Sequence, residues 1–436
     1  MSKNYLYIRI IAFVCIICSM SVSQATAQFS GGAGTTHDPY LIGTPEQFDQ
    51  IRNFKDKKFK LIADLDFKGY EREGGEAWWP VGEWGSGDNS PDRFSGVFDG
   101  NGYAIKNLKA ERVAHDLSIF GVTEGAKIVN LVVENCEIVG EGRLGVVTGA
   151  TFRSELDQIA VINSNCLNTL SDHGSNAGGI TGPLFQSTIT NSYVLGGIIY
   201  GKDGIGGISS VMESGSTIAN CYASCSVEGT TNIGGITGRT SNGYIINSIA
   251  LNSELICHDA NDGRIAGIVN GNDLLSNNYA GVNVKINGVE TSTDLGLNVK
   301  NGENVSDADL ATELFYATKA KFAILETDPS TEDYVQIWKL DTKIAPYPVL
   351  LWQKGISSGI NILKKPQGYS VISSEDNIKV NGLKGNSTVY VYTTSGILIN
   401  KVTANDSAIE IPVTGNGIYI VNILSEGNSH TVKLIK

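Results

Sequence analysis

A short glycine-centred phrase recurs six times between residues 116 and 270, and it limits the possible folds more than any other feature of this chain. Its copies begin 28, 33, 28, 28 and 32 residues apart. A period of this length is typical of stacked supersecondary units, each of which buries its apolar side only against its neighbours. The copies are DLSIFG from Asp116, LGVVTG from Leu144, AGGITG from Ala177, IGGISS from Ile205, IGGITG from Ile233 and IAGIVN from Ile265.

A second phrase, centred on asparagine, keeps step with the first. Asparagine tolerates the left-handed conformation of a sharp corner, and its side-chain amide can bond the equivalent asparagine of the next coil. Glycine suits corners because it reaches positive φ and lets neighbouring backbones approach closely. The sequence therefore predicts an amide ladder along one corner of a stack of coils. The expected members are Asn130, Asn163, Asn191, Asn220, Asn247 and Asn278.

The segments between the two phrases predict strands, because they are short, alternate apolar with small or polar residues, and are rich in Ile, Val, Thr and Tyr. A coil of this length holds two or three strands, and stacked coils lie about 4.8 Å apart. We therefore expect an all-β chain whose main domain is a right-handed parallel β-helix-like solenoid. An antiparallel sandwich or a propeller is the alternative, although a propeller blade normally needs about 40 residues.

Two intervals between the phrases are longer than the others. We place the extra residues in FRSELDQ (residues 152–158) and around HDANDG (residues 258–263). Insertions in a solenoid leave the core undisturbed and project as loops, often on a binding face.

The repeats resemble those of the GLUG-motif family of bacterial surface proteins, whose units carry a Gly-Gly-aliphatic-x-Gly core. The segment GGAGTTHDPYLIGTPEQF (residues 31–48) is similar to that family's opening, and IWKLDTKIAPYPVLLW (residues 337–352) to its closing segment. The resemblance covers about residues 31–352 and implies an exported cell-surface β-solenoid with no catalytic residues to carry over.

On this basis the chain divides into an N-terminal flank and cap over residues 28–115, repeats over 116–290 and a closing segment over 291–354. In the opening segment, Thr44, Pro45 and Gln47 predict the start of a helix, with a capping box and proline at the first helical position.

The composition changes from about residue 355, where alternating strands at short intervals predict a small C-terminal β-sandwich over residues 355–436. The stretch Val391–Leu398, the tripeptide Gly417–Tyr419 and the lysine-rich end resemble C-terminal sorting domains of type IX secretion. This resemblance implies contact with the secretion machinery. An ordinary immunoglobulin-like module is the alternative.

The N-terminus predicts a secretory signal peptide. Lys3 and Arg9 precede an apolar run from Ile10 to Met20, and Ala25–Ala27 form a small-residue cleavage site. We expect cleavage near Ala27 and a secreted or outer-surface location. The apolar run is about half the length that spans a bilayer, so we predict no integral membrane helix. An N-terminal membrane anchor is the alternative.

The charge of the chain argues against nucleic acid as a partner. The formal net charge is -12, and it becomes -14 when Lys3 and Arg9 leave with the signal, with 31 Lys and Arg against 45 Asp and Glu. Such a surface repels phosphate backbones.

Cysteine and histidine give no sign of a metal site, a disulfide framework or a cofactor. An odd number of cysteines at irregular spacing remains after the signal, so we interpret them as small buried hydrophobic residues. The stretch 259–263 weakly resembles a calcium loop but lacks a following bidentate glutamate. The cysteines are Cys136, Cys166, Cys221, Cys225 and Cys257, and the histidines are His37, His115, His173, His258 and His430.

Aromatic residues near the start of the solenoid are the candidate binding site. Trp78, Trp84 and Tyr70 could stack on sugar rings. Trp79–Gly82 matches a structural phrase of the family, which makes an end cap for the core the competing interpretation. Trp84 stands outside that phrase and is the better candidate.

Catalysis is the second interpretation. A polysaccharide lyase or hydrolase needs paired carboxylates, or a base with a cation, at matched positions on adjacent coils. Recurrent acidic positions are absent from the repeats, so we expect non-catalytic adhesion or binding of a glycan or host-surface protein. A polysaccharide-acting enzyme and a structural surface component are the alternatives. The isolated acidic residues, expected in loops, are Asp157, Asp172, Asp203, Asp259 and Asp262.

Overall fold

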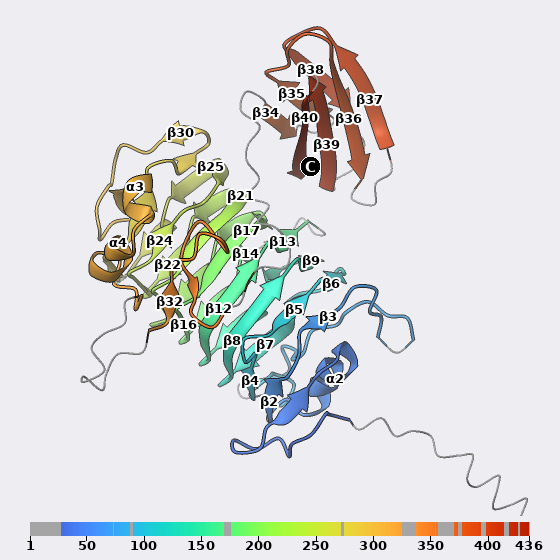
Figure 1. The fold of residues 1–436 in the computed structure, drawn as a ribbon, viewed down its shortest axis with the longest axis vertical. Coiled ribbons are helices and arrows are strands. Elements are labelled where there is room, and N and C mark those ends of the chain that lie inside the picture. The colour runs from blue at the N-terminus through green and yellow to red at the C-terminus, as the bar shows by residue number, and fades with distance from the viewer. Residues whose placement is uncertain are drawn as a thin grey trace, which may run out of the picture.

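A computed structural model describes residues 28–353 apart from 73, 88–89, 170–175, 272–273 and 325–335. It also describes residue 355 and residues 370–435 apart from 374–376, 394–397, 414–417 and 426–427. The expected signal peptide lies outside the described residues. The fold is nearly all-β and contains a parallel β-solenoid of about 7 turns, which confirms the predicted fold class (Figure 1).

One face of the solenoid is a six-stranded sheet in which every neighbouring pair is parallel and one coil apart. Phe120 pairs with Thr148, which pairs with Thr181, so the phrases DLSIFG, LGVVTG and AGGITG stack in the predicted register. The strands are β7 (Phe120–Glu124), β11 (Thr148–Phe152), β15 (Thr181–Phe185), β19 (Ser209–Glu213), β22 (Thr237–Ser241) and β26 (Ala266–Asn270).

The remaining solenoid strands form the other faces, and apart from the antiparallel pair β29 (Lys285–Ile286) and β30 (Val289–Glu290) they are paired in parallel from coil to coil (Figure 1). The longer ones are β8 (Lys127–Glu134), β12 (Glu155–Ile162), β17 (Tyr193–Tyr200), β21 (Tyr222–Gly234) and β25 (Glu254–Gly263). Shorter ones include β16 (Thr188–Thr190), β20 (Thr217–Ala219), β23 (Tyr244–Ile246), β27 (Leu274–Ser276), β9 (Glu137–Gly140), β10 (Arg143–Gly145), β13 (Asn165–Asn168), β14 (Asn176–Gly178) and β18 (Asp203–Gly206).

Aliphatic side chains stack in columns inside the coils, as the repeat requires. One column takes a residue from each of six coils, and all six are buried. Burying an aliphatic side chain stabilises a protein by about 1.5–3 kcal/mol, so each coil depends on the coils above and below it. The column is Ile128, Leu156, Ile189, Ile218, Ile245 and Leu275.

The register of the last glycine phrase differs from our alignment by three residues. Gly234 pairs with Gly263, so the last copy reads DGRIAG over residues 262–267 and lies 29 residues after the preceding one. In the coil below, a Cβ on Gly235 would lie 2.1 Å from the carbonyl oxygen of Arg264. Gly179 and Gly207 lie equally close to the next coil. Ser118 and Val146 hold this position in the first two copies, and Arg264 holds it in the last.

The predicted amide ladder forms only from Asn191 onward. Asn130 and Asn191 donate to Asp99 and Asp157 instead of to an asparagine, and Gln158 rather than Asn163 occupies the corner opposite Asn191. Asn191, Asn220 and Asn247 have φ of 48°, 54° and 50°, and Nδ2 of each later residue donates to Oδ1 of the earlier one, at 3.3 and 3.0 Å. The final rung is Asn277 rather than Asn278: its Nδ2 donates to Asn247 Oδ1 at 2.8 Å and its φ is 56°. Asn278 is buried, and its Oδ1 accepts a hydrogen bond from the N–H of Ser248 instead.

The insertions do not lie where the sequence suggested. Residues 152–158 belong mostly to β11 and β12. These strands pair with residues 33 positions later in the chain and keep one register throughout, so no insertion lies within them. Residues of β13 pair with residues of β9 that lie 28 positions earlier, whereas residues of β14 pair with residues of β10 that lie 33 positions earlier. The five extra residues therefore lie between Asn168 and Asn176. Residues 258–263 form the end of β25 with a single register shift rather than a projecting loop.

The segment that follows the repeats covers two different parts of the solenoid. Residues up to Asn301 lie over the last coil, where the N–H of Arg264 donates to Asn301 Oδ1 at 3.0 Å. Residues 305–324 and 336–353 pack across the outer face of one sheet, where Tyr193 Oη donates to Gln353 Oε1 at 2.6 Å. This part includes α3 (Asp307–Leu310), α4 (Glu313–Thr318), β32 (Trp338–Lys339) and β33 (Val349–Leu350).

The N-terminal flank begins with β1 (Tyr40–Ile42), followed by α2 (Pro45–Asp49) and a 3-10 turn (Gln50–Asn53). Thr44 is the N-cap and Pro45 begins the helix, as predicted. The Gln47 side chain, however, accepts from the N–H of Gly43 at 2.8 Å rather than from that of the cap residue. The flank continues through β2 (Lys58–Leu61), β3 (Leu65–Asp66), β4 (Val97–Asp99), β5 (Ala104–Lys106) and β6 (Lys109–Glu111).

The C-terminal residues form the expected small β-sandwich. Its two antiparallel sheets share one apolar core, to which Val380 and Ile411 contribute from one sheet and Val391 and Val421 from the other. The first sheet has β34 (Ser370–Ser373), β35 (Asn377–Asn381) and β38 (Ala408–Pro412). The second has β37 (Leu398–Ala404), β36 (Ser387–Thr393), β39 (Ile418–Ser425) and β40 (Asn428–Ile435).

Candidate functional site

The three aromatic candidates lie in different environments. Trp78 is only 3% exposed, packs among Phe48 and Phe67, and donates from Nε1 to the Ser118 carbonyl at 3.1 Å. Its ring is therefore part of the core. Tyr70 is half-buried with its ring edge-on to Phe67, and burial raises the pKa of its hydroxyl to about 12. Trp84 is 41% exposed.

Trp84 is held by arginine side chains. Cζ of Arg143 lies 3.8 Å from the centroid of the indole ring, and Cζ of Arg93 lies 5.3 Å from it. Phe152 meets the indole edge-on, with the ring centroids 5.5 Å apart. Cation–π and edge contacts of this kind stabilise one ring orientation. The structure therefore presents Trp84 as a fixed aromatic surface.

Each of the two arginines is anchored by a carboxylate of a neighbouring coil. Arg143 forms a bidentate pair with Asp116, at 2.7 and 2.8 Å. Burial raises the pKa of Asp116, and the hydrogen bonds from Arg143 partly offset that rise. Arg93 is buried, pairs with Glu124 at 2.8 Å and donates to the Trp84 carbonyl at 2.9 Å.

The cluster continues onto the next coil through a pair of phenylalanines. Phe152 and Phe185 stack with their ring centroids 4.7 Å apart and their planes 9° from parallel. Arg153 also pairs with Glu124, so one buried carboxylate joins two arginines. We call Trp84, Arg93, Arg143, Phe152 and Phe185 the Trp84 cluster. Aromatic faces and guanidinium groups suit sugar rings and acidic groups, and the cluster contains no nucleophile beside a base.

Most of the isolated aspartates lie on strands rather than in loops. Asp157, on β12, accepts hydrogen bonds at Oδ1 from Thr190 and Asn191, at 2.7 and 2.8 Å. Asp203, which begins β18, accepts from Thr231 and Asn232 in the same way. Asp259 and Asp262 belong to β25, and Asp172 is outside the described residues. Asp157 and Asp203 are thus used within the coil stack.

The described part of the chain contains no group of three or more His, Cys, Asp or Glu residues that could hold a metal ion. The five cysteines are buried and unpaired, and burial raises the pKa of Cys136, Cys221 and Cys225 to about 12.

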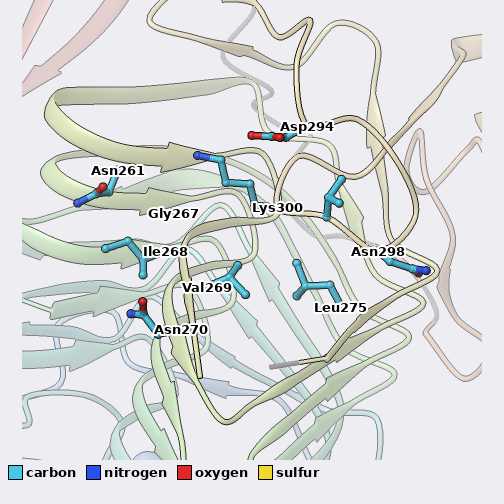
Figure 2. A pocket seen from close by; sticks show the side chains of 10 residues that line it. Asn261, Gly267, Ile268, Val269, Asn270, Leu275, Asp294, Asn298 and Lys300 are labelled. Carbon is cyan, nitrogen blue, oxygen red and sulfur yellow. The ribbon is translucent and has the colours of Figure 1, made fainter. Parts of the chain in front are cut away.

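A hollow lies at the end of the six-stranded sheet, beside β26 (Figure 2). Its volume is about 550 Å³. Ile268, Val269 and Asn270 form one side of it, and Asn298 and Lys300 come from the segment that caps the last coil.

Sequence reasoning missed both the arginines around Trp84 and this hollow. The arginine signal was present, because Asp116 and Arg143 are 27 residues apart and Glu124 and Arg93 are 31 apart, close to one coil. Opposite charges separated by one coil fall side by side once the coils are stacked. The hollow had no such signal, since the true register of the last coil was needed to find it.

These features define a parallel β-solenoid with an exposed, arginine-supported tryptophan. No family model matches the chain. It is 35% identical over 163 residues to the "Putative Gly-rich membrane protein" of Evansella cellulosilytica, covering 34% of this chain and 18% of that protein. It is 28% identical over 254 residues to halomucin of Haloquadratum walsbyi, covering 50% and 3% respectively. The chain therefore spans less than a fifth of either relative.

Among solved structures, the fold is similar to a Bacteroides ovatus protein named "putative immunoglobulin A1 protease". The TM-score is 0.59 with 24% sequence identity, over 75% of this chain and 96% of that one. This likeness concerns the fold. None of the helices in the described part of the chain is long and apolar enough to cross a membrane.

Proposed function

We propose that this chain is a secreted or cell-surface protein that binds an extracellular glycan or a host-surface protein without catalysis, through the Trp84 cluster. The observation that carries the proposal is the exposed indole of Trp84 held at 3.8 Å by a guanidinium that is itself anchored by Asp116. A side chain that is already fixed loses little conformational entropy when a ligand binds.

The chemistry of the cluster favours a ligand with both an apolar and an acidic part. The exposed part of the indole offers an apolar surface, and the part-exposed Arg143 lies against it. The part-exposed Arg153 is joined to the cluster through Glu124. A sugar ring with a carboxylate, or an acidic side chain next to an aromatic one, matches this combination. Trp78 belongs to the core and Tyr70 packs against Phe67, so neither belongs to the proposed contact surface.

Binding of the purified chain to a glycan array and to a host-surface protein array tests the proposal. We expect Trp84→Ala to abolish binding, while Tyr244→Ala, which removes another aromatic residue of similar exposure (39%) from a different face, leaves it unchanged. Circular dichroism of both variants shows whether they are folded. A folded wild-type chain that binds nothing on either array contradicts adhesion.

A polysaccharide lyase or hydrolase on the same scaffold is the competing function, and the name of the Bacteroides ovatus neighbour adds a protease to the enzymes worth assaying. Incubation with uronic-acid glycans, neutral glycans and immunoglobulin A1, followed by absorbance, reducing-end and gel analysis, separates these activities. Turnover of any of them would replace the binding proposal. Self-assembly of the purified chain into sheets would favour a structural surface component.

The route to the surface is also a proposal. The names of the two relatives, a membrane protein and halomucin, support a surface location, as does the signal-like N-terminus. The resemblance of residues 355–436 to a type IX sorting domain supports export across the outer membrane. Part of that resemblance, including residues 394–397 and Gly417, lies outside the described residues. Secretion of a chain truncated after residue 354, compared with the full chain in a type IX host, tests the role of this domain.

A further inference from the structure

The six-stranded sheet is closed at its first edge and open at its last. At the first edge, the N–H groups of Val81 and Phe94 donate to the carbonyls of Ile119 and Val122, at 3.1 and 2.9 Å. Residues before the repeats therefore pair with the outer edge of β7. At the last edge, β22 is the only strand of the described residues that pairs with β26.

Lys300 begins a further coil above β26, but the residues after it do not continue along the sheet. The N–H groups of Ile265 and Ala266 donate to the Lys300 carbonyl, at 2.8 and 3.2 Å. In the coil below, Ile236 and Thr237 donate to the Ile265 carbonyl in the same pattern, at 3.0 and 3.1 Å. The Lys300 carbonyl thus takes the place of one residue of a next coil.

The following residues turn away from the sheet. The carbonyls of Asn301 and Gly302 accept hydrogen bonds from the guanidinium of Arg264, at 2.9 and 3.2 Å. The hollow beside residues 267–270 lies where the rest of that strand would run (Figure 2).

Along the hollow, Val269 is more exposed than the equivalent residues of the coils below. Val269 is 38% exposed, whereas the four residues below it in the same column are fully buried. Its exposure follows from the missing strand above it. The rim carries the amides of Asn261 and Asn298, and the Lys300 ammonium donates to the Asp262 carbonyl at 2.9 Å. The buried members of the column are Thr151, Leu184, Met212 and Thr240.

We propose that this open edge binds an extended segment of a partner polypeptide that carries an apolar side chain, and that this segment adds to β26 as the strand that Lys300 begins. A free strand edge presents N–H and C=O groups at the spacing of a β-ladder, and an extended polypeptide backbone is the ligand that matches it. An apolar side chain of the added segment covers Val269, and the rim amides bond its backbone. This site is separate from the Trp84 cluster and does not depend on the function proposed for it.

A second copy of this chain fits the edge less well than a different polypeptide. Head-to-tail stacking is blocked, because backbone before the repeats already occupies the first edge of the sheet. Tail-to-tail pairing would bring the exposed Asp259 and Asp294 of two chains together, each chain with a net charge of -12. Like charges at short range oppose such contacts.

A labelled peptide IGGITGRTSN, which copies residues 233–242 of the coil below, tests the edge by fluorescence anisotropy with the full mature chain. We expect saturable binding, and slower amide hydrogen exchange at residues 268–270 when the peptide is present. Val269→Lys should weaken binding by about tenfold or more, because it places a charge at the position that the added strand would cover. Val289→Lys, at a residue that is 67% exposed and outside the hollow, should not change binding.

A peptide with proline at the position of Ser241 is the backbone control, and it should not bind because proline removes a ladder donor. In the first strand of the sheet the equivalent residue, Glu124, donates its N–H to the carbonyl of Phe94 in the preceding coil. Absence of saturable binding to the folded wild-type chain would overturn the proposal, as would equal binding to wild type and Val269→Lys. A concentration-dependent dimer in sedimentation that Val269→Lys abolishes would overturn the choice of partner and assign the edge to a second copy.

Discussion

Asn247 donates a hydrogen bond from Nδ2 to Oδ1 of Asn220, one coil below, at 3.0 Å, and Asn220 donates in the same way to Asn191 at 3.3 Å. All three residues have left-handed backbone conformations. One residue type therefore serves both the corner of each coil and the bond between coils.

Substitution of Asn220 separates these two roles. Asn220→Gly keeps the backbone conformation and removes the two hydrogen bonds, which should cost about 1–2 kcal/mol of unfolding free energy. Asn220→Ala adds the strain of a left-handed alanine, another 1–2 kcal/mol. Urea unfolding of both variants measures the difference. Equal stability of the two variants would mean that the backbone conformation contributes nothing at this corner.

Gly207 marks a place where two coils touch. A Cβ there would lie 2.2 Å from the Gly235 carbonyl oxygen and 2.6 Å from the Ala223 Cβ. We expect Gly207→Ala to destabilise the solenoid by about 3 kcal/mol through overpacking. The control is Gly215→Ala, where φ is 81° and a Cβ would meet nothing within 4 Å, so only a conformational cost of about 1 kcal/mol is expected. Thermal unfolding of both variants checks the order, and a smaller effect at Gly207 would contradict the stacking described here.

The cysteines should be inert in the native protein. Cys136, Cys221 and Cys225 are buried, and their raised pKa values of about 12 keep the thiols protonated near neutral pH. We expect negligible reaction with a thiol reagent in buffer, and reaction of all five cysteines of the mature chain after denaturation without reductant. Fewer than five reactive thiols in denaturant would indicate a disulfide.

His258 gives a small pH dependence of stability. Its pKa is raised mainly by the hydrogen bond to Glu228, at 3.0 Å, so the folded state binds the proton more tightly than the unfolded state. The stabilisation is therefore fully present below the unfolded pKa of about 6.5 and is lost as the pH rises through the higher folded pKa. Because the imidazole is half exposed, the effect should stay below about 1 kcal/mol.

The measurement for His258 is the melting temperature between about pH 5.5 and 8.5 for wild type, Glu228→Gln and His258→Gln. The difference between wild type and either variant should be largest at low pH and vanish at high pH. A difference that grows with pH would show that the pair does not stabilise the protonated imidazole.

The sequence by itself determined the coil. The spacing of the glycine and asparagine phrases predicted parallel stacking, because aliphatic residues that recur once per period can be buried only against their equivalents. It also predicted the left-handed corners at Asn191, Asn220 and Asn247, since few other residues accept that conformation. The cap at Thr44 follows from local chemistry in the same way.

Tertiary structure decided what happens where the repeat stops. The register of the last coil is set by the pairing of Gly234 with Gly263 and of Thr237 with Ala266. The local sequence does not reveal it, because Arg264 stands where the other late copies have their second glycine. Trp78 and Trp84 are six residues apart, yet one is buried and the other exposed, because burial depends on which coil and which arginines lie opposite each ring. The open edge at β26 likewise exists because the chain turns away after Lys300, a choice fixed by contacts with Arg264 rather than by the residues that form the strand.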